Sequence, residues 1–156
     1  MTNVAAESNL LSELVLEIFR LNGRLIAAGD ALVAEIGLTS ARWQVIGAIA
    51  LQPRPAPVAH IAHAMGLARQ SVQRIDDELE KTGIVAFRPN PHHKRAKLVA
   101  LTAKGITLNE AAMERQRPWA KALTAGLSRA ELDAALDILS RLRARLEDAM
   151  QSESQT

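Results

Sequence analysis

The sequence has no cysteine, few aromatic residues and no long apolar run. Without cysteine, disulfide bonds, thiolate-ligated zinc and thiol redox sensing are excluded. Apolar residues make up 48% of the chain but aromatic residues only 3%, which favours helix-on-helix packing over a sheet sandwich. No apolar run approaches the roughly 18 residues of a spanning helix, and the N-terminus lacks the features of a signal peptide. We therefore expect a cytoplasmic protein without a membrane partner.

Asp and Glu are missing from the 29 residues between Lys81 and Asn109, although the net charge of the chain is only +2. This segment contains six Lys and Arg residues together with His92 and His93. Two short apolar runs, at 84–87 and 98–101, are typical of strands, and residues 89–95 between them are typical of a hairpin loop. The positive charge is therefore carried by a predicted β-hairpin.

The residues before the hairpin predict a helix-turn-helix, with helices at 58–65 and 69–81. Ala62, Gly66 and Val72 are separated by four and six residues. The motif needs a small residue where the helices touch, a glycine at the left-handed turn and a β-branched residue where the second helix packs. Further apolar residues complete this side of the motif: Ile61, Leu67, Ile75 and Leu79.

The opposite face of the second helix is polar and carries Gln70, Gln73, Arg74 and Asp77. Arg pairs with guanine and Gln with adenine in the major groove of DNA. Arg69 and Ser71, near the start of the helix, are suited to phosphate contacts. All four acids of this helix, Asp76, Asp77, Glu78 and Glu80, are in its C-terminal half, so the half that would enter DNA has none. The alternative is a solvated polar face without a partner.

Long helices are predicted on both sides of this core. Apolar residues at helical spacing describe an amphipathic helix over about 7–35, which Gly37 ends. Thr39 is a predicted N-cap for a second helix reaching about residue 51. After the hairpin, Thr102 begins a helix that runs to Gln116, before Pro118 kinks or breaks it.

A capping box begins the last helix, which extends to about residue 150. Ser128 and Glu131 have the spacing at which each side chain bonds the backbone amide of the other. A small winged domain cannot bury the apolar stripes of helices at both ends of the chain. A second copy of the chain can, so we expect a homodimer.

These features together resemble the MarR (multiple antibiotic resistance regulator) family of winged-helix transcription factors. The resemblance covers nearly the whole chain and is most specific from Leu79 to Gly105. Four groups of residues carry it: Leu38-Thr39 with Trp43; Leu79-Glu80-Lys81-x-Gly83-Ile84-Val85; Arg88-Pro89-Asn90-Pro91 through Lys94-Arg95; and Leu98-Val99-x-Leu101-Thr102-x-x-Gly105.

The resemblance implies a mainly α fold with a small β wing, in a single MarR-like chain over residues 1–156. Residues 39–102 would form the winged helix-turn-helix, and residues 7–36 and 103–150 the dimerisation helices. It also implies a repressor that binds an inverted-repeat operator on double-stranded DNA as a homodimer, with helix 69–81 in the major groove and Arg95 in the minor groove. The predicted DNA-binding residues are Arg69, Gln70, Ser71, Gln73, Arg74, Arg88, Lys94, Arg95 and Lys97.

Family members are usually released from DNA by a small anionic or aromatic effector. Arg42 and Trp43, with Trp119, are candidates for binding one. A core position is more typical for Trp43 and a solvated or ion-paired position for Arg42, while Trp119 could instead fill the dimer core. The chain departs from the family at His93, where an aspartate usually braces the wing. Wing rigidity is therefore in question here.

No enzyme, cofactor or metal is expected. The sequence has no phosphate-binding glycine loop and no nucleophile beside a base. His60 and His63 lie three residues apart, but two ligands do not make a metal site. The alternative function is a protein-interaction module that has kept the winged helix and lost sequence-specific DNA binding.

Overall fold

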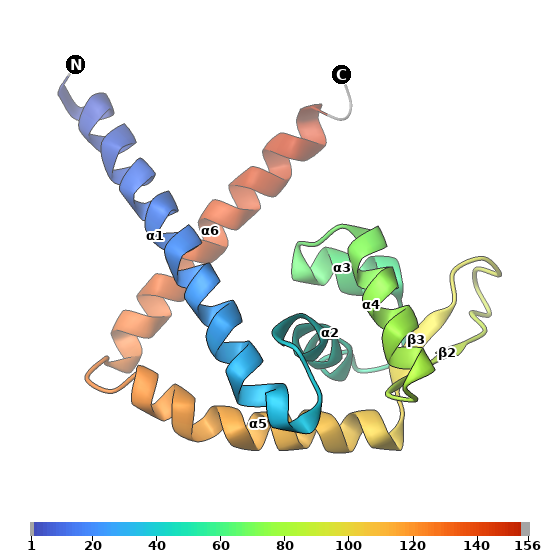
Figure 1. The fold of residues 1–156 in the computed structure, drawn as a ribbon. Coiled ribbons are helices and arrows are strands. Elements are labelled where there is room, and N and C mark those ends of the chain that lie inside the picture. The colour runs from blue at the N-terminus through green and yellow to red at the C-terminus, as the bar shows by residue number, and fades with distance from the viewer. Residues whose placement is uncertain (1, 154–156) are drawn as a thin grey trace. The chain divides into compact units, whose positions relative to one another are not determined.

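The computed structural model describes residues 2–153, and its architecture is mainly helical with one small sheet, as predicted (Figure 1). It divides into two compact units, Met1–Arg117 and Pro118–Thr156. The elements are α1 (Thr2–Val33), a 3₁₀ turn (Ala34–Ile36), α2 (Ser40–Ala50), β1 (Ala56–Pro57), α3 (Val58–Met65), α4 (Arg69–Lys81), β2 (Val85–Arg88), β3 (Leu98–Leu101), α5 (Ala103–Leu123) and α6 (Arg129–Glu153).

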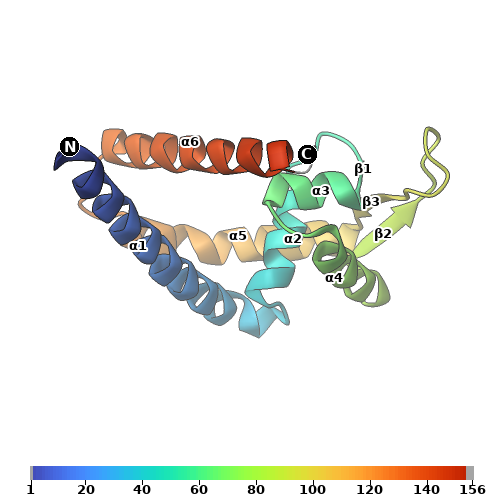
Figure 2. The ribbon, with the colours of Figure 1, turned by 90° about the horizontal axis from the view of Figure 1, so that it is seen from above.

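Within the first unit, helix α1 contacts α2 through its C-terminal end. The rest of α1 extends away from α2, α3 and α4 (Figure 2). Gly37 adopts the left-handed conformation at φ 74°, which a glycine reaches without steric cost. The side chain of Thr39 accepts a hydrogen bond from the backbone amide of Arg42 at 3.3 Å, confirming the predicted cap. At the same joint, Asp30 Oδ1 accepts from the amide of buried Ser40 at 2.6 Å.

The helix-turn-helix has the predicted bounds. Gly66 turns the chain at φ 64°, and the amide of Leu67 donates to the carbonyl of Ala62 at 2.9 Å. Ala62 and Val72 are buried where α3 and α4 meet, as the spacing predicted. Leu67 was predicted to be on the apolar side but is 45% exposed, in the turn outside both helices.

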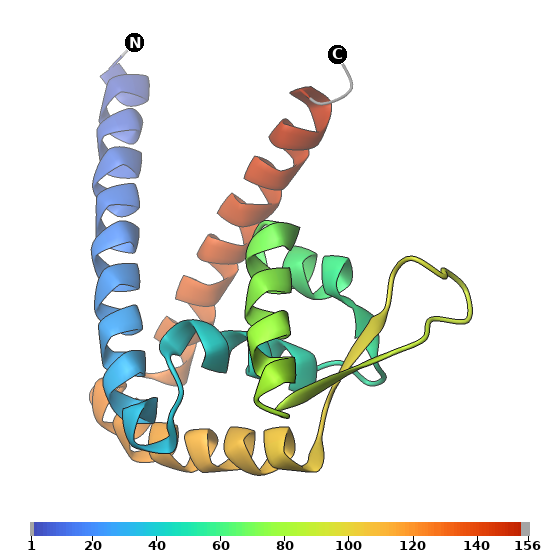
Figure 3. The ribbon, with the colours of Figure 1, turned by 45° about the vertical axis from the view of Figure 1, so that its right-hand side comes forward.

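The sheet has three antiparallel strands in the order β1-β3-β2, where the sequence predicted only two. The missed strand is the pair Ala56–Pro57, which lies opposite Leu98 and Val99. β2 pairs with β3 from Val85↔Leu101 to Arg88↔Leu98, and the loop between them projects beyond α3 and α4 (Figure 3). This hairpin is the wing, defined here as residues 85–101.

The base of the wing is fixed to the start of α5 by Thr102. Its hydroxyl donates to the carbonyl of Gly83 at 2.7 Å, and its amide donates to the carbonyl of Ile84 at 3.0 Å. The same hydroxyl caps α5 by accepting from the amide of Gly105 at 3.2 Å. Gly105 is buried against the carbonyl of Ile84, where a Cβ would clash. The two ends of the wing therefore meet at one point.

The core of the first unit lies among α2, α3, α4 and the sheet. Burying an aliphatic side chain of this size contributes about 1.5–3 kcal/mol relative to exposing it. The largest apolar side chains that are completely enclosed are Ile46, Ile61, Leu79, Val33, Val45, Val72, Val85 and Val99. This core fixes the orientation of α4.

Helix α5 does not stop at Pro118, which corrects the predicted end at Gln116. It continues to Leu123 with Pro118 inside it. Proline removes one backbone hydrogen bond and crowds the carbonyl four residues earlier, but the amides on either side can keep the remaining ladder. The division between the two compact units falls at this proline.

The second unit contains the predicted capping box. Glu131 Oε2 accepts from the amide of Ser128 at 2.7 Å, and Ser128 Oγ accepts from the amide of Glu131 at 3.2 Å. Ser128 Oγ also donates to Glu131 Oε2 at 2.6 Å. These bonds from the Ser128 side chain and backbone lower the pKa of Glu131.

Candidate nucleic-acid interface

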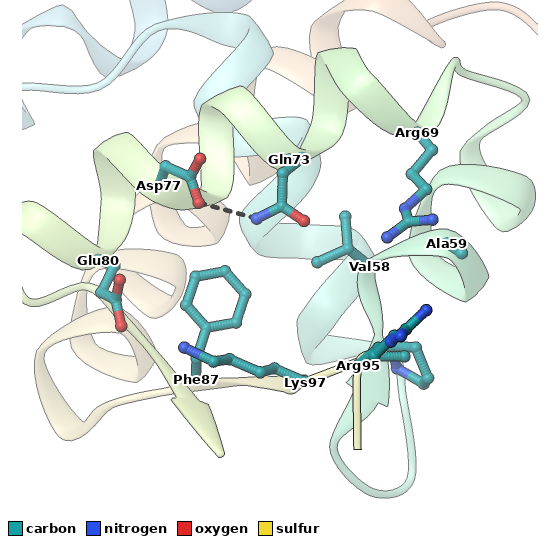
Figure 4. A pocket seen from close by; sticks show the side chains of 11 residues that line it. Val58, Ala59, Arg69, Gln73, Asp77, Glu80, Phe87, Arg95 and Lys97 are labelled. Carbon is teal, nitrogen blue, oxygen red and sulfur yellow. Dashed lines mark hydrogen bonds between the residues drawn. The ribbon is translucent and has the colours of Figure 1, made fainter. Parts of the chain in front are cut away.

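Helix α4 and the wing form the two sides of an open groove of about 320 Å³ (Figure 4). Four predicted DNA-binding residues line it: Arg69 and Gln73 from α4, and Arg95 and Lys97 from the wing. Pro57, Val58 and Phe87 supply apolar surface between them. The structure thus brings α4 and the basic hairpin together around one concave surface.

The remaining predicted residues are exposed beside this groove. Gln70 and Arg74 line a second hollow with Arg69 and Gln73, on the same side of α4. Ser71 is exposed in the first turn of that helix. Arg88 ends β2, and Lys94 lies in the exposed loop of the wing. All nine positions are accessible or half-buried, as a DNA-contacting set must be.

The loop of the wing is shaped by local hydrogen bonds. The side chain of Asn90 accepts from the amide of His92 at 3.0 Å, and the carbonyl of His93 accepts from the amide of Ala96 at 3.1 Å. The side chains of His92 and His93 are exposed, next to Lys94 and Arg95. Protonating either histidine would add positive charge to the loop of the wing.

Sequence reasoning missed a second acid-free segment, residues 36–75, directly before the acids of α4. Between residues 36 and 109 there are ten Lys and Arg residues and four acids, and all four acids lie on α4: Asp76, Asp77, Glu78 and Glu80. Counting acids along the whole chain would have revealed this. The excess of positive charge therefore extends over residues 36–109, well beyond the hairpin.

Each of the four acids has a different environment. Asp77 Oδ1 accepts from Gln73 Nε2 at 2.8 Å, and Glu78 Oε2 is paired with Arg42 Nη2 at 2.9 Å. Glu80 lines the groove, and Asp76 is completely buried. The sequence grouped Asp76 with the other acids in the C-terminal half of the helix and did not indicate its burial.

Asp76 has no hydrogen-bond partner on either carboxylate oxygen in the part of the chain that the structure describes. Burial, with a smaller contribution from the neighbouring Asp77, raises its pKa from 3.8 to about 7. An unpartnered ionised carboxylate is costly in an apolar interior, so the neutral form is favoured. A group that titrates near neutral pH thus lies inside the recognition helix.

The three candidate effector-binding residues are divided between the two units. Arg42 connects α2 to α4 through its ion pair with Glu78. Trp43 is half-buried and packs against the core, as the alternative interpretation held. Trp119 belongs to the second unit. An effector pocket formed by these residues stays a prediction.

A different hollow, of about 380 Å³, lies between the end of α2, β3 and the first half of α5. Arg54, Ile106 and Glu110 are among its lining residues. Asn109 also lines it, and its side-chain oxygen is buried without a partner in the described part of the chain. Sequence analysis did not indicate this hollow, because its residues come from three distant segments.

His60 and His63 are both exposed on α3. Within residues 2–153, no third His, Asp or Glu joins them to complete a metal-binding cluster. Nor does any helix in that range have the length and apolarity needed to span a bilayer.

A helix-turn-helix followed by a basic wing defines a winged-helix DNA-binding protein. The family model described as MarR family matches residues 36–96. The uncharacterised protein Rv2011c of Mycobacterium tuberculosis is 33% identical over 135 residues, which are 86% of this chain and 93% of that protein. The transcriptional activatory protein BadR of Rhodopseudomonas palustris is 28% identical over 103 residues, 64% of this chain and 58% of BadR.

Solved structures share the fold. A mutant of Escherichia coli MarR complexed with operator DNA superposes with a TM-score of 0.76 at 21% identity, covering 86% of this chain and 96% of the other. Staphylococcus aureus MarR in complex with salicylate and kanamycin gives 0.76 at 16% identity, covering 94% and 99%. The chain belongs to the MarR family of transcription regulators.

Proposed function

We propose that this chain is a homodimeric transcriptional repressor that binds an inverted-repeat operator and is released by a small anionic or aromatic effector. The observation that carries the proposal is the groove between α4 and the wing. Arg69, Gln73, Arg95 and Lys97 line it together, and the neighbouring hollow adds Gln70 and Arg74. This surface is suited to a DNA partner, and no catalytic role is proposed for it.

The chemistry of these residues matches the two tasks of a DNA reader. Arg and Gln side chains on α4 can contact base edges in the major groove, while Lys and Arg on the wing neutralise phosphates or enter the minor groove. The structure of the E. coli MarR mutant with operator DNA supports the same role for this fold. Several phosphate contacts per subunit would make binding strongly dependent on salt.

The test is selection of the purified full-length protein against a random duplex library at two salt concentrations. The expected result is an enriched inverted repeat whose half-sites are about one helical turn, roughly 10 bp, apart. Binding without any enriched sequence would overturn the proposal. It would favour the alternative, a protein-interaction module.

Repression is proposed because a dimer covering an operator can occlude a promoter. The relative BadR carries the name of an activatory protein, so the sign of regulation needs its own measurement. A reporter driven by the promoter that holds the enriched sequence should rise when the gene for this protein is deleted. A fall in that reporter would identify an activator.

For the effector, the S. aureus structure with salicylate suggests an aromatic carboxylate as the probe. Arg42 is the proposed anion contact, and Glu78 on α4 already holds it at 2.9 Å. A carboxylate that binds Arg42 would compete with Glu78. Effector binding would therefore change how α2 holds the recognition helix.

This effector model predicts the behaviour of three variants with millimolar salicylate. Wild type should gain thermal stability and lose operator affinity, and Arg42→Met should lose both responses. Glu78→Gln removes the ion pair but keeps Arg42, so salicylate should still raise its thermal stability. Its operator affinity should change little with salicylate, because the ion pair that the effector would break is already absent. Arg54→Met, at another exposed arginine, is the matched control. An unchanged response in Arg42→Met would exclude Arg42 as the anion contact.

A further inference from the structure

One side of α4 faces the groove with a graded set of side chains. Arg69, Gln73, Asp77 and Glu80 follow one another at helical spacing and all line the groove. Cationic and neutral donors are therefore near the N-terminal end, and carboxylates near the C-terminal end. Asp77 is exposed on a surface that is otherwise built to meet a polyanion, where a carboxylate opposes binding. Such a residue needs a compensating role.

The hydrogen bond between Gln73 and Asp77 supplies that role. Gln73 Nε2 donates to Asp77 Oδ1 at 2.8 Å, and Figure 4 shows the other end of the amide, Oε1, directed toward Arg69. An ionised carboxylate can only accept hydrogen bonds, so the reversed amide would place two acceptors against each other. Asp77 therefore distinguishes the two amide orientations of Gln73.

Amide orientation decides which base a glutamine reads. Adenine presents an N6 amino donor and an N7 acceptor in the major groove, whereas guanine presents two acceptors and thymine one. An amide that is free to flip can satisfy either pattern in part. A fixed amide has its oxygen available for an amino group and its second N–H available for an acceptor, which is the pattern complementary to adenine.

We propose that Asp77 is a positioning residue that holds the Gln73 amide in one orientation, so that Gln73 selects adenine at one position of each operator half-site. The inference rests on the proposed DNA-binding function. It assigns Asp77 no contact with DNA. The negative charge of Asp77 lowers affinity for all sequences, and in exchange one base contact becomes selective.

The experiment compares the full-length wild type with four variants by sequencing selected duplexes and by titrating random DNA. Gln73→Ala identifies the position that Gln73 reads, because preference there should disappear. Asp77→Ala should keep the rest of the motif while adenine preference at that position falls from roughly tenfold to about twofold. Its affinity for random DNA should rise, because a negative charge has been removed.

Two variants separate positioning from charge. Asp77→Asn loses the charge and carries an amide that can donate as well as accept, so it no longer distinguishes the two orientations of Gln73. Adenine preference should fall as in Asp77→Ala, while affinity for random DNA rises. Glu80→Ala removes a charge from the same groove without touching Gln73, so its affinity for random DNA should rise while adenine preference is retained. If the Gln73–Asp77 pair is purely structural, both Asp77 variants should alter helix stability and leave base preference unchanged.

Several results would overturn the inference. A wild-type preference for guanine, thymine or cytosine at the Gln73 position would contradict the assigned orientation. An unchanged adenine preference in Asp77→Ala, or an equal loss in Glu80→Ala, would remove the positioning role while the proposed function stands. If wild type enriches no motif at all, both the proposed function and this inference fail.

Discussion

Among the described residues of the first unit, two polar side chains are buried. They are Asp76, which is completely enclosed, and Ser40. Helices α2 and α3 and strand β2 pack on α4, and none of their charged groups pairs with Asp76. Arg42 on α2 is already paired with Glu78, His60 and His63 on α3 are exposed, and Arg88 on β2 is exposed. The carboxyl group therefore depends on its own proton for neutrality.

This isolation predicts a stability that depends on pH. The pKa of Asp76 is raised from 3.8 to about 7 in the folded state, so the unfolded state loses the proton first. The contribution of Asp76 to the free energy of unfolding is fully present below pH 3.8. It decreases as the pH rises toward 7 and is constant above that. Asp76→Leu should remove this component and stabilise the protein by about 2–4 kcal/mol at pH 8.

Urea unfolding of wild type and Asp76→Leu between pH 5 and 8 tests this prediction. The difference in unfolding free energy between the two proteins should grow with pH. The other ionisable groups are present in both proteins, so their contributions cancel in the difference. Parallel curves would show that Asp76 has no raised pKa.

The burial of Asp76 could have been foreseen from helix phase. It follows Val72 by four residues and precedes Leu79 by three, and both of these are buried. The run of acids from Asp76 to Glu80 obscured that arithmetic, since acids are rarely enclosed without a partner. The groove-facing positions Gln73 and Asp77 were correctly placed on the polar face by the same reasoning.

At the scale of elements, the capping box at the start of α6 gives a second prediction. Ser128→Ala should destabilise the first turn of α6 by about 1 kcal/mol, because the amide of Glu131 loses its acceptor. The pKa of Glu131 is lowered in the folded state, so its contribution is present above pH 4.5 and is lost as the pH falls further. Ser128→Ala should weaken this acid dependence.

Amide hydrogen exchange of the first turn of α6 measures both effects. Ser140→Ala is the matched control, since it removes a hydroxyl from the middle of the same helix, where alanine favours the helix. Faster exchange in Ser140→Ala than in Ser128→Ala would contradict the capping role.

Most elements could be predicted from the sequence because particular residue types, glycine in a left-handed turn or threonine as an N-cap, mark where helices end and begin. Gly37, Thr39 and Gly66 mark ends and starts that the structure confirms. The strand Ala56–Pro57 could not be predicted, because two residues have no periodicity and pairing with β3 is a tertiary event. The predicted end of α5 at Gln116 was wrong for a different reason. Proline usually ends a helix, but here the helix continues on both sides of Pro118.

At the scale of the whole molecule, α1 carries apolar side chains that the described chain leaves exposed: Leu10, Leu11, Val15, Leu16, Phe19, Leu21, Leu25 and Ile26. Helix α6 has its own exposed set: Leu132, Leu136, Ile138, Leu139, Leu146 and Met150. An apolar surface of this extent is typical of an interface. A second copy of the chain is the proposed occupant, since symmetric dimers are the commonest assembly.

The dimer predicts concentration-dependent stability. Wild type should sediment as a dimer at micromolar concentration, with a melting temperature that rises with protein concentration. Phe19→Glu, at a side chain that is 69% exposed, should shift the protein toward monomer and abolish cooperative operator binding. Leu51→Glu, at an 84% exposed position outside both helices, should leave the dimer intact. A wild-type monomer at all concentrations would refute the dimer.

The meeting of both wing ends at Thr102 has a consequence for the integrity of the chain. Lys94, Arg95 and Lys97 are exposed in a loop, which makes them natural cleavage sites for a trypsin-like protease. A cut there leaves β2 and β3 paired and both strands attached through Thr102 to the carbonyls of Gly83 and Ile84. The nicked protein would stay folded as two associated fragments, so a protease could disrupt the proposed minor-groove contact of Arg95 and leave α4 in place.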